Sequence, residues 1–128
     1  MGTLAEDKMA HILVAEDEDS VREFVTRALI SMGHDVTEAK DGGEALERLQ
    51  NNHFDLLLTD IVMPVMDGIA LALKAASLKP KLRILMMSGY SAERQRAHNL
   101  DALIHQVLAK PFTLDQLRES VDQALNIN

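Results

Sequence analysis

The chain has 128 residues, of which 47% are hydrophobic and 3% aromatic, and it contains no cysteine. This length suits one domain with an aliphatic core, and the lack of cysteine excludes disulfides, thiolate zinc sites and cysteine catalysis. The net charge of −7 argues against nucleic-acid binding, and no apolar run reaches the ~18 residues of a membrane span. We expect a cytoplasmic protein, with residues 1–9 as a flexible leader and residues 10–126 as a single domain.

The first part of the chain predicts a strand, a helix and a second strand. His11–Ala15 is a short β-branched run that stops at acids, which is typical of a buried strand. Residues 19–33 have apolar side chains at helical spacing, with Asp19 as the expected N-cap and Gly33 as the expected stop. The predicted inward face of this helix comprises Val21, Phe24, Val25, Ala28, Leu29 and Met32. His34–Ala39 predicts a weaker strand.

The middle of the chain repeats this order. A helix is expected over residues 41–52, where Asp41 and Glu44 are spaced like an N-cap and its partner three residues later. Phe54–Asp60 is a second strongly apolar strand. A third helix over residues 68–80 ends at a proline, which cannot continue it.

The last part of the chain contains two more strands, Leu82–Ser88 and His105–Ala109. Between them, residues 91–100 predict a polar helix with little apolar periodicity. A final helix over residues 113–125 begins with the capping-box pattern of Thr113 and Gln116. Its predicted apolar face comprises Leu114, Leu117, Val121 and Leu125.

Strands and helices thus alternate five times, which requires a parallel sheet with helices on both faces. Apolar strands without in–out alternation fit a sheet that is buried on both sides. The predicted fold is α/β, with a doubly wound parallel sheet of five strands. Ligands of such sheets bind outside the carboxyl ends of the strands.

Polar side chains stand at four of these carboxyl ends. Glu16 and Asp17 follow the first strand, Asp60 ends the third, Ser88 ends the fourth and Lys110 follows the fifth. Three carboxylates that converge on one pocket repel one another, so we expect a divalent cation, and oxygen ligands select Mg²⁺ or a similar hard ion. Beside a cation, a hydroxyl and a lysine, Asp60 can attack phosphorus and become an aspartyl phosphate.

Each of these residues alone has an ordinary structural explanation. An acidic pair is often a solvated loop or a helix cap, an aspartate at a strand end is often an Asx-turn, and a lysine before proline is common. The joint placement of these chemical types at four strand ends favours the functional interpretation.

Four motifs resemble the receiver domains of bacterial two-component response regulators, which have the flavodoxin-like CheY fold. These motifs are "ILVAEDEDSVREF", "LLLTDIVMPVMDG", "MMSGY" and "AKPF". The resemblance implies the strand order 2-1-3-4-5 and a cis bond between Lys110 and Pro111. It also implies a role for each matching residue: Asp60 as phosphoacceptor, Glu16 and Asp17 as the acidic metal pair, the backbone carbonyl of Val62 as a further metal contact, Ser88 as the switch hydroxyl and Lys110 as the pocket lysine.

The sequences "LLLTDIVMPVMDGI" and "RALISMGHDV" resemble those of the CpdR subgroup of stand-alone receivers. That resemblance implies a histidine kinase or histidine phosphotransferase as phosphodonor. It also implies control of ClpXP proteolysis, in which the unphosphorylated form primes the protease and phosphorylation switches this off. A phosphorelay intermediate, or a regulator of motility or of a kinase, is the alternative.

The chain departs from the common receiver pattern at three positions. Glu16 replaces the commoner aspartate of the acidic pair, and Val107 stands where many receivers have an aromatic switch residue. Tyr90, two residues after Ser88, is the one tyrosine of the chain. We therefore expect Tyr90 to carry the signal, with residues 91–107 and the last helix as the partner face.

Three rival functions fit the residues less well. A phosphohydrolase of the haloacid-dehalogenase type would have a second aspartate two residues after the nucleophile, where this chain has Val62. An adaptor with an inactive pocket does not explain the intact set of acids, hydroxyl and lysine. Because three residues follow Leu125, no DNA-binding domain is expected, and we expect no enzyme activity beyond phosphorylation and dephosphorylation of the chain itself.

Overall fold

The computed structural model describes residues 9–89 and 106–126 of the chain. Strands and helices alternate along the first range, and the second range contains β5 and α5. The elements are β1 (His11–Ala15), α1 (Asp19–Ser31), β2 (Asp35–Ala39), α2 (Gly42–Asn51), β3 (Leu56–Asp60), α3 (Gly68–Leu78), β4 (Arg83–Ser88), β5 (Gln106–Ala109) and α5 (Leu114–Leu125). The polar helix expected over residues 91–100 lies outside the described residues. Among the helices that the structure describes, none is long and apolar enough to cross a membrane.

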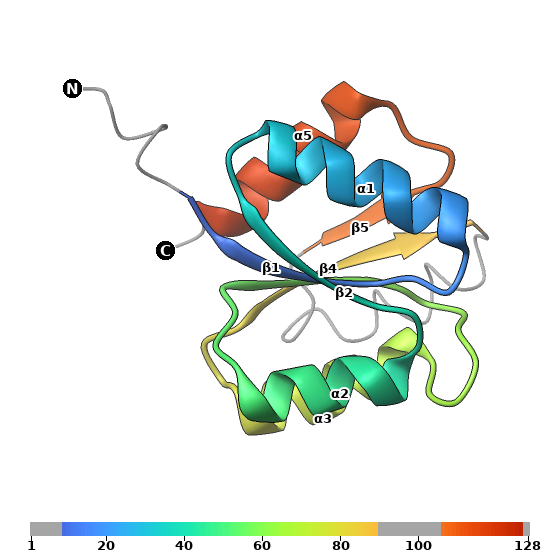
Figure 1. Cartoon of the computed structure of the whole chain (residues 1–128), viewed down its shortest axis with the longest axis vertical. Helices are drawn as coiled ribbons and strands as arrows, with labels where there is room; N and C mark the ends of the chain where they lie inside the picture. Colours follow the sequence, from blue (N-terminus) through green and yellow to red (C-terminus); the bar gives the residue numbers. More distant parts are fainter. Residues whose placement is uncertain (1–8, 90–105, 127–128) are drawn as a thin grey trace.

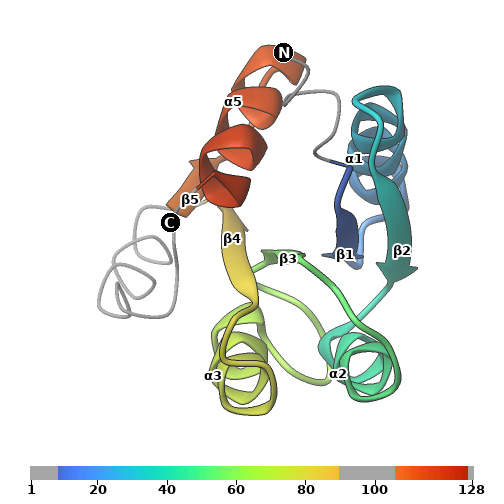
Figure 2. The same ribbon diagram turned by 90° about the vertical axis from the view of Figure 1, so that its left-hand side faces the viewer.

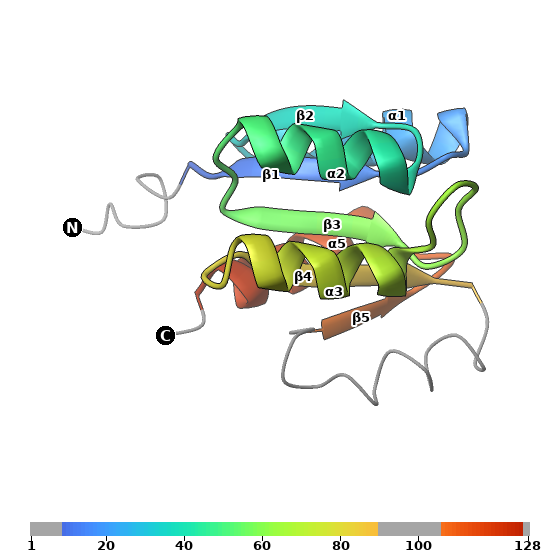
Figure 3. The same cartoon turned by 90° about the horizontal axis from the view of Figure 1, so that it is seen from below.

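All five strands run parallel in one sheet of order β2-β1-β3-β4-β5 (Figure 3). Helices α1 and α5 cover one face of the sheet, and α2 and α3 cover the other (Figures 1 and 2). The predicted fold class and strand order are therefore confirmed. Because the strands are parallel, all five carboxyl ends lie along the same edge of the sheet.

The sheet is buried on both faces because successive residues of each central strand enter different cores. Ile12 and Val14 of β1 pack with residues of α1 and α5, whereas Leu13 and Ala15 pack with residues of α2 and α3. All four side chains are fully buried. This double burial explains why the strands read as continuous apolar runs rather than as alternating patterns.

The N-cap of helix α1 lies one residue before the predicted cap. Its N-cap is Glu18, which makes no side-chain capping bond, so the assignment of Asp19 as the cap was wrong. Asp19 is the first helical residue, and its carboxylate pairs instead with Arg22 at 2.6 Å. The Glu18 amide is already used, since it donates to the side chain of Glu16 at 3.0 Å and so fixes the turn before the helix.

The end of α1 is a Schellman motif, as the glycine predicted. Gly33 has φ +96°, a conformation that costs little only for glycine. The amide of His34 donates to the carbonyl of Leu29, and the amide of Gly33 donates to that of Ile30. These two bonds satisfy the last carbonyls of the helix and turn the chain into β2.

Two residues assigned to inward helix faces are instead exposed. Phe24 is 43% exposed, and its ring packs against Phe112 with a centroid distance of 6.2 Å. Leu114 is 41% exposed because it is the first residue of α5, ahead of the buried stripe that begins at Leu117. The helix patterns predicted the buried Val25, Ala28 and Leu29 of α1 and Leu117 and Val121 of α5 correctly and failed at these two positions.

Both predicted caps of the later helices are present. Asp41 accepts from the Glu44 amide at 2.7 Å, and the Glu44 carboxylate accepts from the amide of Lys40, one residue before the expected partner. Thr113 and Gln116 form the complete capping box of α5. These caps set the directions in which α2 and α5 leave the sheet.

Candidate functional site

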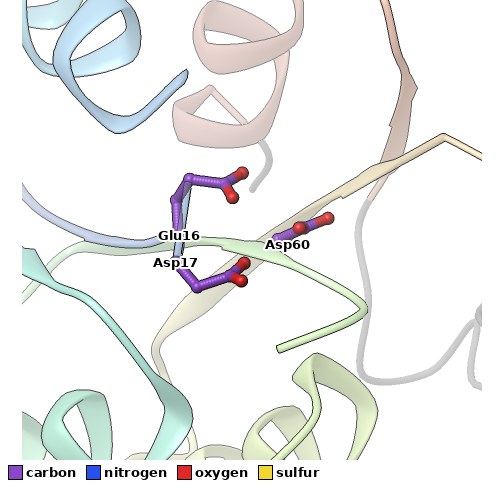
Figure 4. Close-up of side chains that lie close together, drawn as sticks. All are labelled: Glu16, Asp17 and Asp60. Carbon is purple, nitrogen blue, oxygen red and sulfur yellow. The ribbon is translucent and has the colours of Figure 1, made fainter. Parts of the chain in front are cut away.

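Three carboxylates meet at the carboxyl edge of the sheet. Glu16 and Asp17 directly follow β1, and Asp60 is the last residue of β3, which pairs with β1 through Ala15 and Thr59. Carboxylate oxygens of the three residues lie within 4.8 Å of one another. Figure 4 shows the three side chains directed into the same space from two neighbouring strands.

Two of these acids are buried and share one lysine. Glu16 is 0% and Asp60 7% exposed, whereas Asp17 is exposed to solvent. The Lys110 Nζ atom lies 3.0 Å from Glu16 Oε1 and 3.2 Å from Asp60 Oδ2. The Lys110 amide donates to the carbonyl of Ser88 at 2.7 Å, which holds the residue beside the end of β4. The Lys110–Pro111 bond is cis, as the resemblance implied.

Burial dominates the protonation equilibria of the site. It raises the pKa of Glu16, with the hydrogen bond from the Glu18 amide opposing this rise and the charge of Asp60 adding to it. Burial also raises the pKa of Asp60, although the nearby Lys110 ammonium opposes the change. For Lys110, burial lowers the pKa, but the bonds and charges of Glu16 and Asp60 outweigh it and the net direction is upward. All three pKa values are raised because two buried acids share one positive charge.

The donor set fits a hard divalent cation. Three carboxylates and one ammonium, all ionised, leave an excess of two negative charges in the pocket. The converging atoms are oxygens, which Mg²⁺ prefers as ligands. Binding of a cation with charge +2 would neutralise the excess and favour the ionised form of Asp60.

The loop after Asp60 is tied down at both ends. The Ile61 amide donates to the carbonyl of Met87 on β4, and the Gly68 amide donates to the carbonyl of Ile61 at 2.6 Å. Within the loop, the Met66 amide bonds the carbonyl of Pro64 around Val65, whose φ of +74° defines a strained γ-turn. The two ends of the loop are thus bonded in place, and Val62 between them lines the same cavity as Asp60.

The remaining predicted site residues differ in how far the structure places them. Ser88 ends β4 next to the site and is fully buried. Val107 of β5 is half-buried and packs against the core beneath α2 and α3. Tyr90 lies outside the described residues, so its expected part in signalling stays a prediction.

A cavity of about 620 Å³ opens beside the acids. Asp60, Val62 and Lys110 line it on the side of the sheet, and Phe24 and Phe112 line it on the side of the helices. Sequence patterns did not indicate the aromatic wall, because Phe24 was assigned to the core. The Asp60 carboxylate is thus reached from this cavity.

Sequence reasoning also missed Arg22 of α1. Its Nη1 atom donates to the backbone carbonyl of Glu16 at 2.8 Å, and its Nη2 atom lies 2.6 Å from Asp19 Oδ1. The spacing of Asp19 and Arg22, three residues apart on a helix, signals an ion pair in the sequence. Nothing in that spacing indicates the second bond, which reaches back to the acidic loop.

Comparison with known proteins decides the family. The model of the response regulator receiver domain family matches residues 12–122, which include all three carboxylates and Lys110. The chain belongs to the response regulator receiver family. Receiver domains are signalling switches of two-component systems rather than classical enzymes, and aspartate phosphorylation is general among them.

Two relatives from Brucella abortus (strain 2308) are similar in sequence to this receiver. The response regulator receiver protein CpdR is 42% identical over 117 residues, which cover 91% of this chain and 98% of CpdR. The sensor kinase CckA is 41% identical over 119 residues, but the match covers only 12% of that protein. Receiver domains of this kind thus occur both as separate proteins and within histidine kinases.

Solved receiver structures agree with the fold. A CheY-like receiver from Methanospirillum hungatei JF-1 has a TM-score of 0.86 and 28% identity, and the match covers 93% of this chain and 95% of that one. TrrA from Thermotoga maritima, solved in complex with Mg(2+)-BeF, has a TM-score of 0.83 and 30% identity, with 91% of this chain and all of that one covered. Receiver domains bind Mg²⁺ at their acidic site, and the carboxylate cluster described above is the matching feature of this chain.

Proposed function

We propose that this receiver accepts a phosphoryl group on Asp60 in a Mg²⁺-dependent reaction and thereby switches its binding to partner proteins. The observation that carries the proposal is the convergence of the Glu16, Asp17 and Asp60 carboxylates, with Lys110 Nζ at 3.2 Å from Asp60. A structural ion pair needs one acid and one base. This site instead buries two acids around one lysine and adds a third acid at its edge.

The transfer step balances without any further reactant. An Asp60 carboxylate oxygen forms a bond to phosphorus while the bond from phosphorus to the imidazole nitrogen of a phosphohistidine breaks. The electron pair stays on that nitrogen, which takes a proton from water. The rigid end of β3 holds the attacking oxygen in place, and a pre-positioned nucleophile lowers the entropic part of the barrier.

The other residues of the site act on the charge of the transferring group. Lys110, already 3.2 Å from Asp60, would bind a phosphoryl oxygen, and the Ser88 hydroxyl would donate to another. Glu16, Asp17, Asp60 and the backbone carbonyl of Val62 would hold Mg²⁺. Bound there, the cation supplies charge neutralisation between the acids and the incoming phosphoryl oxygens.

The output that we propose is CpdR-like. The support is 42% identity to CpdR over nearly the full length of both chains. On this proposal, a histidine kinase or histidine phosphotransferase in the cytoplasm loads Asp60. The unphosphorylated form then primes the ClpX protease machinery, and phosphorylation stops this. The match to CckA supports the alternative of a phosphorelay or kinase-regulating receiver.

The signal is proposed to leave the site through the loop after β4. Phosphoryl oxygens on Asp60 would draw Ser88 toward the pocket and move Tyr90, two residues further along. Val107 is half-buried on β5, the strand next to β4, where an aromatic switch residue would stand in many receivers. Its small side chain leaves the gating role to Tyr90.

Partner binding tests the proposed output. We would immobilise the wild type, the wild type loaded with Mg²⁺ and beryllofluoride, and Asp60→Asn treated in the same way, and then add purified ClpX. The unloaded wild type should retain ClpX at least about tenfold more strongly than the loaded form, a bias of ~1.4 kcal/mol. Asp60→Asn should bind like the unloaded wild type under both treatments.

The controls separate the possible failures. If loaded and unloaded wild type retain ClpX equally, or neither retains it, the CpdR-like output is wrong. A phosphohistidine-containing phosphotransferase added to the same beads would still report Asp60 loading in that event, and this result would favour the relay alternative.

A further inference from the structure

Arg22 ties together the two ends of the acidic loop that follows β1. Its guanidinium donates to the backbone carbonyl of Glu16 at 2.8 Å and pairs with the Asp19 carboxylate at 2.6 Å. The Arg22 side chain is 17% exposed, so most of it is packed against the loop rather than in solvent. Between its two contacts lies Asp17, the exposed carboxylate of the metal site.

We propose that Arg22 is a positioning residue, which holds the loop in the one conformation that turns Asp17 toward Asp60. This inference rests on the proposed function, because it concerns how the Mg²⁺ site used there is kept in shape. Arg22 would touch neither the cation nor the phosphoryl group. It would act on both through the backbone of Glu16 and the start of α1.

Neither of the other described bonds of this loop fixes the peptide group between Glu16 and Asp17. The Glu16 amide bonds the carbonyl of Ala39, and the Glu18 amide bonds the Glu16 side chain. The N-cap of α1 makes no side-chain capping bond, so no cap fixes the angle at which the helix leaves the loop. The Glu18 amide ties the N-cap of α1 to the Glu16 side chain, and the Arg22 guanidinium adds the bond from the helix to the Glu16 backbone.

Repulsion among the three carboxylates makes the Arg22 bonds important for the position of Asp17. Glu16, Asp17 and Asp60 place like charges within 4.8 Å of one another, and Asp17 is the member free to swing into solvent. Without the Arg22 bonds, the carboxylate of Asp17 would relax away from the other two before any cation arrives. Binding of Mg²⁺ would then have to restore the geometry, which lowers its affinity.

Coulomb's law alone predicts the opposite result for removal of Arg22. Loss of a positive charge beside the acids, with Asp19 left unpaired, should attract a cation more strongly if the geometry stays the same. The positioning role predicts weaker binding. The sign of the change in Mg²⁺ affinity therefore distinguishes the two effects.

The test is a calorimetric titration of the full chain with Mg²⁺ alone, comparing the wild type with Arg22→Gln, Arg22→Lys and Arg27→Gln. Arg22→Gln should raise the Kd for Mg²⁺ on the order of tenfold, the usual effect of losing an outer-shell partner. Arg22→Lys should fall in between, because an ammonium is a point donor and cannot span both oxygens as the planar fork does. Arg27→Gln removes the same charge from the same helix, where Arg27 pairs with exposed Glu23, and should leave the Kd unchanged.

Unchanged or tighter binding of Mg²⁺ by Arg22→Gln would overturn the positioning role. A lower melting temperature in metal-free buffer with an unchanged Kd would overturn it as well, since that is the mark of a merely structural residue. Should Arg22→Gln not fold, the Kd of Arg22→Lys for Mg²⁺ decides between the two roles in the same way. If the wild type binds no Mg²⁺, or Asp17→Asn binds it equally well, the proposed metal site itself fails, which is a different outcome.

Discussion

Replacement of Lys110 by alanine is expected to slow phosphoryl loading by about 10²–10³-fold and to destabilise the metal-free protein by about 2–3 kcal/mol. The catalytic loss follows because the ammonium lies 3.2 Å from Asp60, where charge develops during transfer. The loss of stability follows because Glu16 and Asp60 would remain buried without the Lys110 ammonium that pairs with both. The expected loss of stability is smaller than the full cost of breaking a buried ion pair, because the Lys110 side chain is 21% exposed.

Mg²⁺ should offset part of the stability loss but not the catalytic loss. A cation that binds only the folded protein adds stability that grows with the logarithm of its concentration above the Kd, and it neutralises the same two acids. Chemical denaturation with and without Mg²⁺ measures the first effect, and loading from acetyl phosphate measures the second. Lys74→Ala, which removes an exposed lysine from α3, is the matched control and should change neither. Lys110→Ala with wild-type loading rates would show that Lys110 does not act on the phosphoryl group.

Gly68→Ala is expected to destabilise the protein by about 3 kcal/mol and to abolish Mg²⁺ binding. A Cβ atom at this position would lie 2.1 Å from the carbonyl oxygen of Asp60 and 2.9 Å from the Cα atom of Ile61. Both are backbone atoms, and the amide of Gly68 is itself bonded to Ile61 at 2.6 Å. The start of α3 and the end of β3 must therefore separate, which moves Asp60.

Gly89→Ala is the matched control for this prediction. A Cβ atom there meets no described atom within 4 Å, so the change in unfolding free energy should stay within about 0.5 kcal/mol. Urea unfolding of both variants gives the comparison, and a Mg²⁺ titration of Gly68→Ala reports the site. Wild-type stability in Gly68→Ala would mean that β3 and α3 do not meet as tightly as described.

The sequence predicted the sheet and the meeting of the acids for a simple geometric reason. Parallel strands end along one edge, so the residues at positions 16, 17 and 60 had to lie near one another once the order 2-1-3-4-5 made β1 and β3 neighbours. The prediction failed where the deciding contact joins elements in ways that spacing does not encode. The Asp19 cap was wrong because the Arg22 amide bonds the Glu18 carbonyl, which starts the helix one residue earlier, and the Asp19 carboxylate pairs with Arg22. Phe24 was misplaced because its partner is Phe112 of a distant loop.

The sharing of Lys110 between two acids could not be read from the sequence either. Whether a lysine pairs with one carboxylate or two depends on side-chain reach and burial, which strand order leaves open. The bond from Arg22 to a backbone carbonyl is a similar case, because every residue offers the same carbonyl and the sequence does not mark one.

Mass spectrometry of the intact chain determines whether Asp60 takes the phosphoryl group. After incubation with acetyl phosphate and Mg²⁺, the wild type should gain one phosphoryl group that hydroxylamine removes. Asp115→Asn, which removes an exposed carboxylate from α5, should gain the same group, and Asp60→Asn should gain none. An unlabelled wild type, or equal labelling of Asp60→Asn, would show that Asp60 is not the phosphoacceptor.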